Sequence, residues 1–343
     1  MFAVVKADAY GHGAKEVAIA LQENGADAFA VSNIVEAEEL RTAGITLPIL
    51  ILGYTPAKLA DRLAKLNIAQ CVFCKEYAEN LNQSAKSFGV KLNVHIKLDT
   101  GMGRIGFDCR TDELKGLDDI KEVLQLSNLN ADGIFTHFAV ADSLTNDNKT
   151  FTKGQEQRFQ KTVSLLEHGG HTFKVRHCEN SAATLSKLAD SVDAVRAGIV
   201  LYGLTPDPDF PMPQEFKSAM SLYSVVSQVK MLDAEQTVSY GRKYKADTKR
   251  KIATVSAGYA DGVPRLLSNK GNVIIRGKRA PIAGTVCMDQ FCVDVTDIDD
   301  VKEGDVVTIF GNGIDVEEVA KNAQTINYEI VCSISKRVPK VHI

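Results

Sequence analysis

The stretch FAVVKADAYGHGAKEVAIALQENGADAFAVS, residues 2–32, contains one complete strand–helix–strand pattern. It begins with the apolar, β-branched run FAVVK and ends with a second such run, AFAVS. Between them, the apolar residues of AKEVAIALQENG recur at steps of three and four and stop at a glycine, which is typical of an amphipathic helix. Two strands joined by such a helix favour parallel pairing, because parallel neighbours need a long crossover connection.

The same pattern repeats as far as about residue 205. The predicted strands are FAVVK (2–6), AFAVS (28–32), PILIL (48–52), AQCVF (69–73), LNVHIKLD (92–99), GIFTHF (133–138), FKVRHC (173–178) and DAVRAGI (193–199). Strands that alternate with helices in this way predict an α/β fold, a (β/α)8 TIM-type barrel. The alternative is a doubly wound open sheet, which usually has fewer strands.

The pattern changes at LTPDPDFPMPQEF (204–216), which holds four of the nine prolines and indicates an interdomain linker. Beyond it, the runs SLYSVVSQVKML, KIATVSAG, GNVIIRG and DVVTIFG alternate between apolar and polar residues and are separated by turn residues. We therefore expect a barrel over 1–205, a proline-rich linker over 206–216 and a C-terminal mainly-β domain over 217–343. One short helix is expected near DVEEVAKNA.

Composition narrows the class of protein. The 343 residues are 45% hydrophobic and 24% charged, with a net charge of −3, which argues against nucleic acid or an acidic membrane as the main partner. No apolar run approaches a membrane span, and no signal segment opens the sequence. The seven cysteines are scattered and suit reduced thiols in the cytoplasm. We expect the isolated pair CVFC (71–74) to be buried strand thiols, without a metal.

Polar residues stand where the predicted barrel strands end, which is where the catalytic groups of such barrels lie. These residues are Lys6, Ser32, Asp99, His137, His177 and Arg196. Lys6 has two interpretations. Its ammonium group reaches solvent while its stem covers apolar surface, or it is a Schiff-base lysine beside an aldehyde cofactor. Tyr10, four residues later, can reach the same end of the barrel.

AVVKADAYGHG (3–13) resembles the pyridoxal-phosphate lysine motif of the alanine racemase family, and further signatures of that family follow in order. They are LDTGMGRIG (98–106), THF (136–138), HCENSA (177–182), VRAGIVLYG (195–203), VSYG (238–241), GYADG (258–262), CMDQ (287–290) and RVP (337–339). The resemblance covers essentially the whole chain. It implies the cofactor pyridoxal 5'-phosphate and an isomerase that interconverts L- and D-alanine, supplying D-alanine for peptidoglycan.

The resemblance assigns a role to each matching residue. Lys6 carries the cofactor. Ser181, with the amides of Gly198 and Ile199 and with help from Tyr10, holds the phosphate. Arg104 donates to the phenolic oxygen, and Arg196 faces the pyridine nitrogen. By the same resemblance Asn180 and His137 also belong to the cofactor-binding set. Asn180 and Ser181 are strong N-cap residues as well, which is the purely structural alternative. Because a guanidinium stays protonated, it leaves the ring nitrogen neutral and weakens the cofactor as an electron sink.

Two further residues support this centre. His137 is expected to link Arg196 to the catalytic tyrosine. Lys97 is expected to point into the barrel near Arg104, where two cations would repel each other. Many family members carbamylate the matching lysine, and we expect the same of Lys97.

The second base is expected in the β-domain. Racemization removes a proton from one face of a planar carbanion and returns it to the other, so it needs two bases. By resemblance these are Lys6 and Tyr240, and the family takes this tyrosine from the partner subunit, which implies a homodimer with shared active sites. Met288 and Arg104 are expected near the substrate carboxylate, and Tyr259 and Asp289 at the entryway.

Several alternatives remain open. GMGRIG matches a dinucleotide fingerprint, but it follows the fifth predicted strand and does not open a helix at its last glycine. A broad-specificity racemase, a decarboxylase and a pyridoxal-phosphate carrier without turnover are the rivals, and Arg196 speaks against the decarboxylase. Family members normally carry a strand and a helix before the lysine strand, and a barrel without that helix would expose apolar surface. Lys336 stands where some relatives have a phosphate-binding tyrosine.

Overall fold

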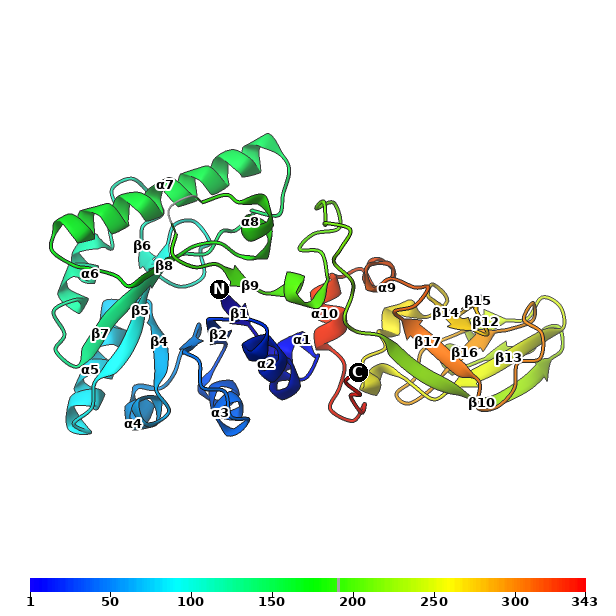
Figure 1. The fold of residues 1–343 in the computed structure, drawn as a ribbon. Coiled ribbons are helices and arrows are strands. Elements are labelled where there is room, and N and C mark those ends of the chain that lie inside the picture. Colours follow the sequence, from blue (N-terminus) through cyan, green and yellow to red (C-terminus); the bar gives the residue numbers. More distant parts are fainter. Residues whose placement is uncertain (190–191) are drawn as a thin grey trace. The chain divides into compact units, whose positions relative to one another are not determined.

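The computed structural model describes residues 1–189 and 192–343, and the chain divides into two compact units (Figure 1). The first unit comprises Met1–Ala9, Gly13–Leu201 and Thr205–Met212. The second comprises Tyr10–His12, Tyr202–Leu204 and Pro213–Ile343. The assignment of 206–216 as a linker between domains 1–205 and 217–343 stays a prediction.

A parallel sheet forms the centre of the first unit, with strands in the order β8-β7-β5-β4-β3-β2-β1-β9 and with β6 paired to β5. Its strands are β1 (Phe2–Val4), β2 (Ala28–Val31), β3 (Ile49–Ile51), β4 (Ile68–Val72), β5 (Leu92–Asp99), β6 (Phe107–Asp108), β7 (Leu129–Phe135), β8 (Val175–His177) and β9 (Arg196–Ala197). Backbone bonds also join the two ends of this order. The Arg196 amide donates to the Glu179 carbonyl over 2.9 Å, and the Asp193 amide donates to the Arg176 carbonyl over 2.8 Å. The sheet therefore closes, and the predicted barrel is confirmed.

Helices follow the strands, as the periodicity predicts. They are α1 (Lys6–Tyr10), α2 (Ala14–Glu23), α3 (Ile34–Thr42), α4 (Ala60–Lys65), α5 (Lys75–Ser87), α6 (Leu117–Val123), α7 (Asn146–His168) and α8 (Ser181–Ser186), with the short 3-10 helices η1 (Ala57–Leu59) and η2 (Ile199–Tyr202). Strands β1, β2 and β3 are buried along their whole length, which explains why their sequences are continuous apolar runs. In CVFC, Cys71 is buried in β4, but Cys74 is exposed at the start of α5. The expectation of two buried thiols was therefore wrong for Cys74, because the strand ends before it.

The second unit contains a mainly antiparallel sheet in the order β15-β14-β17-β10-β13-β16 and a separate pair, β11-β12. The strands are β10 (Leu222–Leu232), β11 (Thr237–Val238), β12 (Tyr244–Lys245), β13 (Arg250–Val255), β14 (Asn272–Ile275), β15 (Lys278–Pro281), β16 (Phe291–Asp294) and β17 (Val306–Phe310). The helices are η3 (Tyr240–Arg242), η4 (Tyr259–Asp261), η5 (Arg265–Leu267), α9 (Val316–Asn322) and α10 (Asn327–Cys332). The predicted β-domain and the helix at DVEEVAKNA are confirmed, whereas α10 was not predicted.

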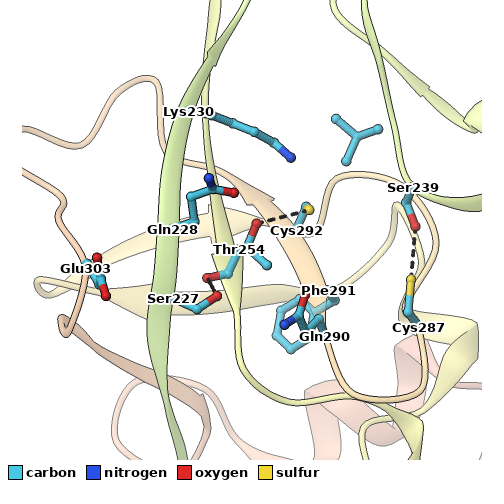
Figure 2. Close-up of a pocket in the computed structure, with 11 residues that line it drawn as sticks. Ser227, Gln228, Lys230, Ser239, Thr254, Cys287, Gln290, Phe291, Cys292 and Glu303 are labelled. Atoms are coloured by element: carbon cyan, nitrogen blue, oxygen red, sulfur yellow. Dashed lines mark hydrogen bonds between the residues drawn. The ribbon is translucent and has the colours of Figure 1, made fainter.

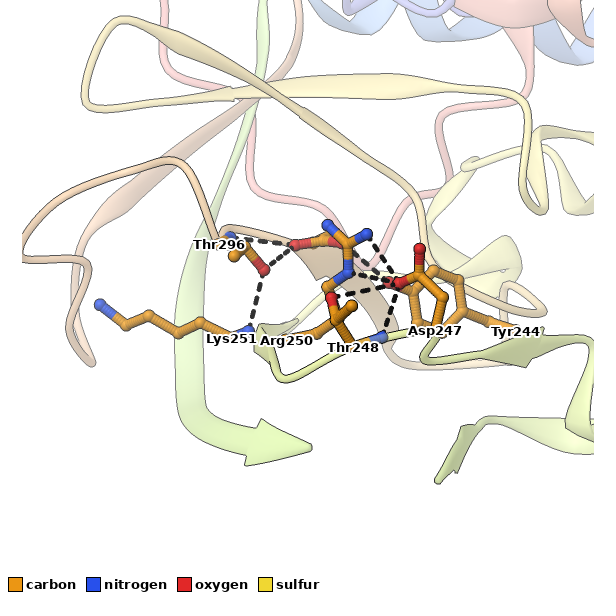
Figure 3. A network of polar contacts seen from close by, with 7 residues as sticks. Tyr244, Asp247, Thr248, Arg250, Lys251 and Thr296 are labelled. Carbon is orange, nitrogen blue, oxygen red and sulfur yellow. Dashed lines mark hydrogen bonds and ion pairs between the residues drawn. The ribbon is translucent and has the colours of Figure 1, made fainter. Parts of the chain in front are cut away.

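A polar network ties β12, β13 and the end of β16 together (Figure 3). The Tyr244 hydroxyl donates to Asp294 over 2.8 Å, and the Thr296 amide donates to the other carboxylate oxygen over 2.9 Å. Arg250 binds Asp247 through two of its nitrogens, at 2.7 and 3.0 Å. These bonds join the β11-β12 pair, which flanks the Tyr240 turn in the sequence, to β16 at the edge of the larger sheet.

Among the described helices, none is both long enough and apolar enough to cross a lipid bilayer.

Candidate active site

The turn that begins at Lys6 has an unusual backbone. Ala7, Asp8, Ala9 and Tyr10 all have φ between 52° and 55°, so α1 is a left-handed turn. Left-handed backbone costs about 1–2 kcal/mol per residue for residues with a Cβ. Such conformations persist where the surroundings fix them, and they cluster at functional sites.

Side-chain carboxylates hold this turn in place. Asp8 accepts the Ala14 amide over 2.8 Å, and Glu36 accepts the Ala7 amide over 2.8 Å. The other oxygen of Glu36 accepts the Ser32 amide over 2.6 Å. The half-buried Lys6 is therefore set on a turn whose shape is fixed from both sides.

Ser181, Asn180 and Gly198 form a second fixed group in the first unit. Asn180 is the N-cap of α8 and accepts the Ala183 amide over 3.1 Å, as the structural alternative has it, and its role toward a cofactor stays a prediction. The Gly198 amide donates to the buried Ser181 hydroxyl over 2.9 Å. Because the hydroxyl oxygen accepts this bond, its own proton remains available to an acceptor. Ile199 is buried directly after Gly198 and begins η2.

Arg196 is buried at the start of β9 and is held through both terminal nitrogens. NH1 donates to His177 Nδ1 over 2.8 Å. NH2 lies 3.1 Å from His137 Nδ1 and donates to the Thr136 and Cys178 carbonyls over 2.8 and 3.1 Å. Burial lowers the pKa of Arg196 to about 10, so the guanidinium remains charged at neutral pH.

The histidine neighbours of Arg196 are held in the neutral form mainly by their burial. Burial first, and then the charge of Arg196, lowers the pKa of both His137 and His177 well below the ordinary value. His177 was noted in the sequence only as a strand end, and His95, which lies 2.9 Å from it, was not recognised. The sequence feature that could have identified both residues is a histidine inside a predicted strand, in HIK of β5 and in VRH of β8.

Lys97 points into the barrel, as predicted. It is 4% exposed, donates to the Leu98 carbonyl over 3.2 Å and lies 5.1 Å from the centre of the Phe135 ring. Burial, followed by the charge of Arg196, lowers the pKa of Lys97 to about 7. The amine of Lys97 is therefore neutral in a large fraction of the molecules at neutral pH.

The loop that carries Arg104 is shaped by its glycines and by Asp99. Asp99 accepts the amides of Gly101 and Gly103, both over 3.0 Å. The short strand β6 follows the last glycine of GMGRIG, so no helix starts there and the dinucleotide interpretation is excluded. Arg104 itself is exposed on this loop.

In the second unit, Tyr240 lies on a turn that is hydrogen-bonded to Thr285. Tyr240 is 75% exposed, and its carbonyl accepts the hydroxyl of the buried Thr285 over 2.9 Å. The preceding residue, Ser239, has φ 67° and donates to the Thr285 carbonyl over 2.6 Å. The backbone of this tyrosine is therefore fixed while its ring extends into solvent within the unit.

The predicted entryway residues lie on two loops that are bonded together. The Tyr259 amide donates to the Cys287 carbonyl and the Ala260 amide to the Met288 carbonyl, both over 3.0 Å. Arg337, of the RVP motif, donates to Asp261 and to Asp289, each over 2.7 Å. Tyr259, Met288 and Asp289 are thus neighbours, and the bridging role of Arg337 was not predicted.

Three tyrosines meet elsewhere in this unit. The Tyr10 ring lies 5.2 Å from Tyr202 and 6.0 Å from Tyr328, centre to centre. Burial, followed by the negative field of Tyr328, raises the pKa of Tyr10, so it remains a neutral phenol that can donate. Tyr328 lies on α10, the helix that the sequence did not predict, and was therefore missed. Lys336 is exposed, and its role stays a prediction.

A cavity of about 610 Å³ adjoins the Tyr240 turn on the β-domain (Figure 2). Ser239 and Cys287 face each other at its edge, with their side-chain oxygen and sulfur 3.3 Å apart. Thr254 and Cys292 lie across it, 3.8 Å apart.

The predicted residues thus gather in two groups. The first unit holds Lys6, Lys97, Arg104, His137, Asn180, Ser181, Arg196, Gly198 and Ile199. The second holds Tyr10, Tyr240, Tyr259, Met288 and Asp289. The first group is rich in cations and hydrogen-bond donors, and the second in phenols and exposed polar groups. Their separate roles at a site stay predictions.

Comparison with known proteins identifies the family. Residues 1–206 match the description "Alanine racemase, N-terminal domain", and residues 219–342 match "Alanine racemase, C-terminal domain". The alanine racemase of Clostridium perfringens is 46% identical over 347 aligned positions, covering 100% of this chain and 88% of that protein.

Solved structures agree. The alanine racemase of Clostridium difficile 630 has a TM-score of 0.91 at 40% identity, covering 98% of this chain and 87% of that one. The structure of that protein in complex with cycloserine has a TM-score of 0.89 at 39% identity, covering 98% of this chain and 86% of that one. Both halves of the chain match in sequence, and the whole matches in fold. The chain belongs to the alanine racemase family of isomerases.

Proposed function

We propose that this protein interconverts L-alanine and D-alanine with pyridoxal 5'-phosphate, using Lys6 and Tyr240 as its two bases. The observation that carries the proposal is the set of donors in the first unit. A lysine on a fixed left-handed turn, a buried guanidinium and a serine hydroxyl joined to a glycine amide occur together in one barrel. The names of the relatives supply the amino acid.

The residues present fit this cofactor. A phosphate dianion needs N–H and O–H donors, and Ser181 keeps its hydroxyl proton because its oxygen accepts the Gly198 amide. Tyr10, with its raised pKa, is a further neutral donor. A pyridine nitrogen needs a donor that does not give up its proton, and Arg196 is such a donor. Its terminal nitrogens are engaged with histidines and carbonyls, so we assign Nε to the ring nitrogen.

When bound, pyridoxal phosphate supplies an aldehyde that condenses with amines and a ring that delocalises the electron pair left on the substrate Cα. Lys6 Nζ holds the cofactor between turnovers and takes or returns the α-proton on one face. Tyr240 Oη takes or returns it on the other face. Arg104 and the Met288 amide orient the substrate carboxylate, while Tyr259 and Asp289 border the entry path.

Because Tyr240 extends from its turn with 75% of its surface exposed, we propose that it serves the active site of a second copy in a cytoplasmic homodimer. His137, whose Nδ1 contacts Arg196, keeps its proton on Nε2, and this N–H is the donor we assign to the tyrosine oxygen. The product D-alanine would enter peptidoglycan.

The test is a trapping experiment on the purified full chain. After incubation with pyridoxal phosphate and reduction with borohydride, we expect one pyridoxyl group per chain, mapped to Lys6, in a protein that racemizes alanine. Lys6→Ala should abolish both results, while Lys15→Ala, on α2, should change neither. A protein that racemizes alanine with the label elsewhere, or labels at Lys6 and racemizes other amino acids but not alanine, contradicts the proposal.

A further inference from the structure

A chain of polar contacts leads away from Arg196 through the barrel interior. Arg196 NH1 lies 2.8 Å from His177 Nδ1, and His177 Nε2 lies 2.9 Å from His95 Nδ1. His95 Nε2 then lies 3.7 Å from Asp132 Oδ1. The four residues come from β9, β8, β5 and β7, so the contacts cross the barrel from strand to strand.

The direction of these bonds follows from chemistry. A guanidinium has only donors, so His177 must accept at Nδ1. The single proton of a neutral His177 is then on Nε2, and it donates to His95 Nδ1. By the same step the proton of His95 is on Nε2, the nitrogen that faces Asp132. A proton on either Nδ1 would set two donors against each other.

The histidines are enclosed in a way that keeps them neutral and oriented. The His177 ring is stacked between Phe2 and Phe135, with centres 4.9 and 4.7 Å away. His177 is 0% exposed and His95 is 6% exposed. Burial, followed by the charge of Arg196, lowers the pKa of His95 to about 4.

The sheet itself is modified at this place. In the β5–β7 ladder, Val94 pairs with Ala131 but His95 pairs with Gly133, so Asp132 is an extra residue in a bulge. Bulges turn a side chain in a new direction. A Cβ on Gly133 would lie 2.4 Å from His95 Nδ1, so this strand leaves room for the imidazole ring.

Asp132 ends the chain of contacts near solvent. Its side chain is 20% exposed, and Lys174 lies 3.8 Å from its outer oxygen, Oδ2. The inner oxygen, Oδ1, is buried and has no hydrogen-bond partner among the described residues, with His95 Nε2 at 3.7 Å as its ion-pair neighbour. A buried carboxylate oxygen without a donor is costly unless a donor closes on it.

We infer that Asp132, His95 and His177 form a relay that orients Arg196 and strengthens its bond to His177. They are positioning residues, since none is assigned to the cofactor or the substrate. The negative charge of Asp132 makes His95 a better acceptor, which makes His177 a better acceptor for Arg196. Lys97 and Cys71 also face Arg196, but neither accepts its NH1 proton. The catalytic consequence rests on the proposed function, whereas the relay itself does not.

The relay is tested first without turnover. In cofactor-free protein with ¹⁵N-labelled histidine, we expect two neutral Nε2–H imidazoles with nitrogen–nitrogen coupling across the His177–His95 hydrogen bond. Asp132→Asn should retain the coupling and shift the His95 Nε2–H resonance. Lys174→Gln, which removes the other neighbour of Asp132, should leave that resonance in place. A proton on His177 Nδ1, or no coupling in the wild type, overturns the relay.

Two substitutions of His95 separate orientation from packing. His95→Phe keeps an aromatic ring but leaves the His177 Nε2–H without an acceptor, and we expect kcat to fall about tenfold with KM within about twofold. His95→Gln offers an oxygen acceptor and should restore most of kcat. If His95→Phe retains full kcat, or if His95→Gln is as impaired as His95→Phe, the positioning role is wrong. A protein that shows the coupling but never racemizes alanine contradicts the proposed function and leaves the relay standing.

Discussion

At the scale of single residues, burial next to a fixed cation decides the chemistry of the barrel interior. Lys97 and Arg196 share one apolar space, bordered by the same Phe135 ring at 5.1 and 5.3 Å. Two charges cannot both be stabilised there, and the lysine is the one that yields, because a guanidinium holds its proton more strongly. This is the physical basis for expecting carbamylation, which turns the repelling ammonium into an anion.

The prediction for Lys97 concerns pH. Carbon dioxide reacts with the neutral amine, and the pKa of Lys97 is lowered to about 7. At a fixed concentration of dissolved carbon dioxide, uptake of ¹³C label at Lys97 should therefore rise as the pH is raised through about 7. The measurement is ¹³C NMR combined with native mass spectrometry.

Lys97→Arg is the matched control, because it keeps the positive charge but forms no stable carbamate. It should show no labelled signal at any pH. A wild-type protein whose label is absent, or whose label persists in Lys97→Arg, contradicts the assignment.

At the level of helices and strands, Gly133 and Gly154 differ in whether the structure has room for a side chain in place of the glycine. Gly133 lies in β7, where any Cβ would meet the His95 ring at 2.4 Å. Gly154 lies inside the helix α7, where the nearest atom to an added Cβ is the flexible end of Arg158, at 3.2 Å. The first glycine makes space for a side chain, while the second only weakens its helix.

Substitution by alanine should therefore have opposite effects on the free energy of unfolding. Gly133→Ala should lower it by about 1–3 kcal/mol, as overpacking does. Gly154→Ala should raise it by up to about 1 kcal/mol, because alanine favours a helix. Denaturation in urea measures both.

In the NMR spectra of the same two variants, the His95 ring resonances should shift from their wild-type positions only in Gly133→Ala. Equal stability of the two variants would contradict the close approach of the His95 ring to β7.

The elements also show how far sequence reasoning reaches. The strand LNVHIKLD at 92–99 was predicted to the residue, because its apolar residues occupy every second position over its whole length. The bulge at Asp132 was not predictable, since it depends on the register between two strands far apart in sequence. Helix α10 was missed because TINYEIVCS is too short to show a helical period.

At the scale of the whole molecule, the predicted site residues come from both compact units. Motifs identified most of them, because each signature lies in a short, continuous stretch. His95, Asp132, Thr285 and Tyr328 carry no motif of their own, and their roles arise only from contacts made in three dimensions. The residues expected to touch cofactor or substrate can thus be predicted from the sequence, while the contacts that support them require a structure.

In the proposed dimer, Lys6 and Tyr240 act on one substrate molecule from two different chains. This sharing is measured by mixing the inactive variants Lys6→Ala and Tyr240→Phe, followed by dissociation and reassociation of the dimers. A shared site would place both defects together in one site of each mixed dimer and leave the other site intact.

With random pairing, half the dimers are mixed and half their sites are intact, so we expect about a quarter of wild-type kcat for alanine racemization, on a per-chain basis. Each variant alone should stay below about 1%. If the mixture stays as inactive as its components although mixed dimers form, Lys6 and Tyr240 do not combine across subunits, and the proposed shared site is wrong.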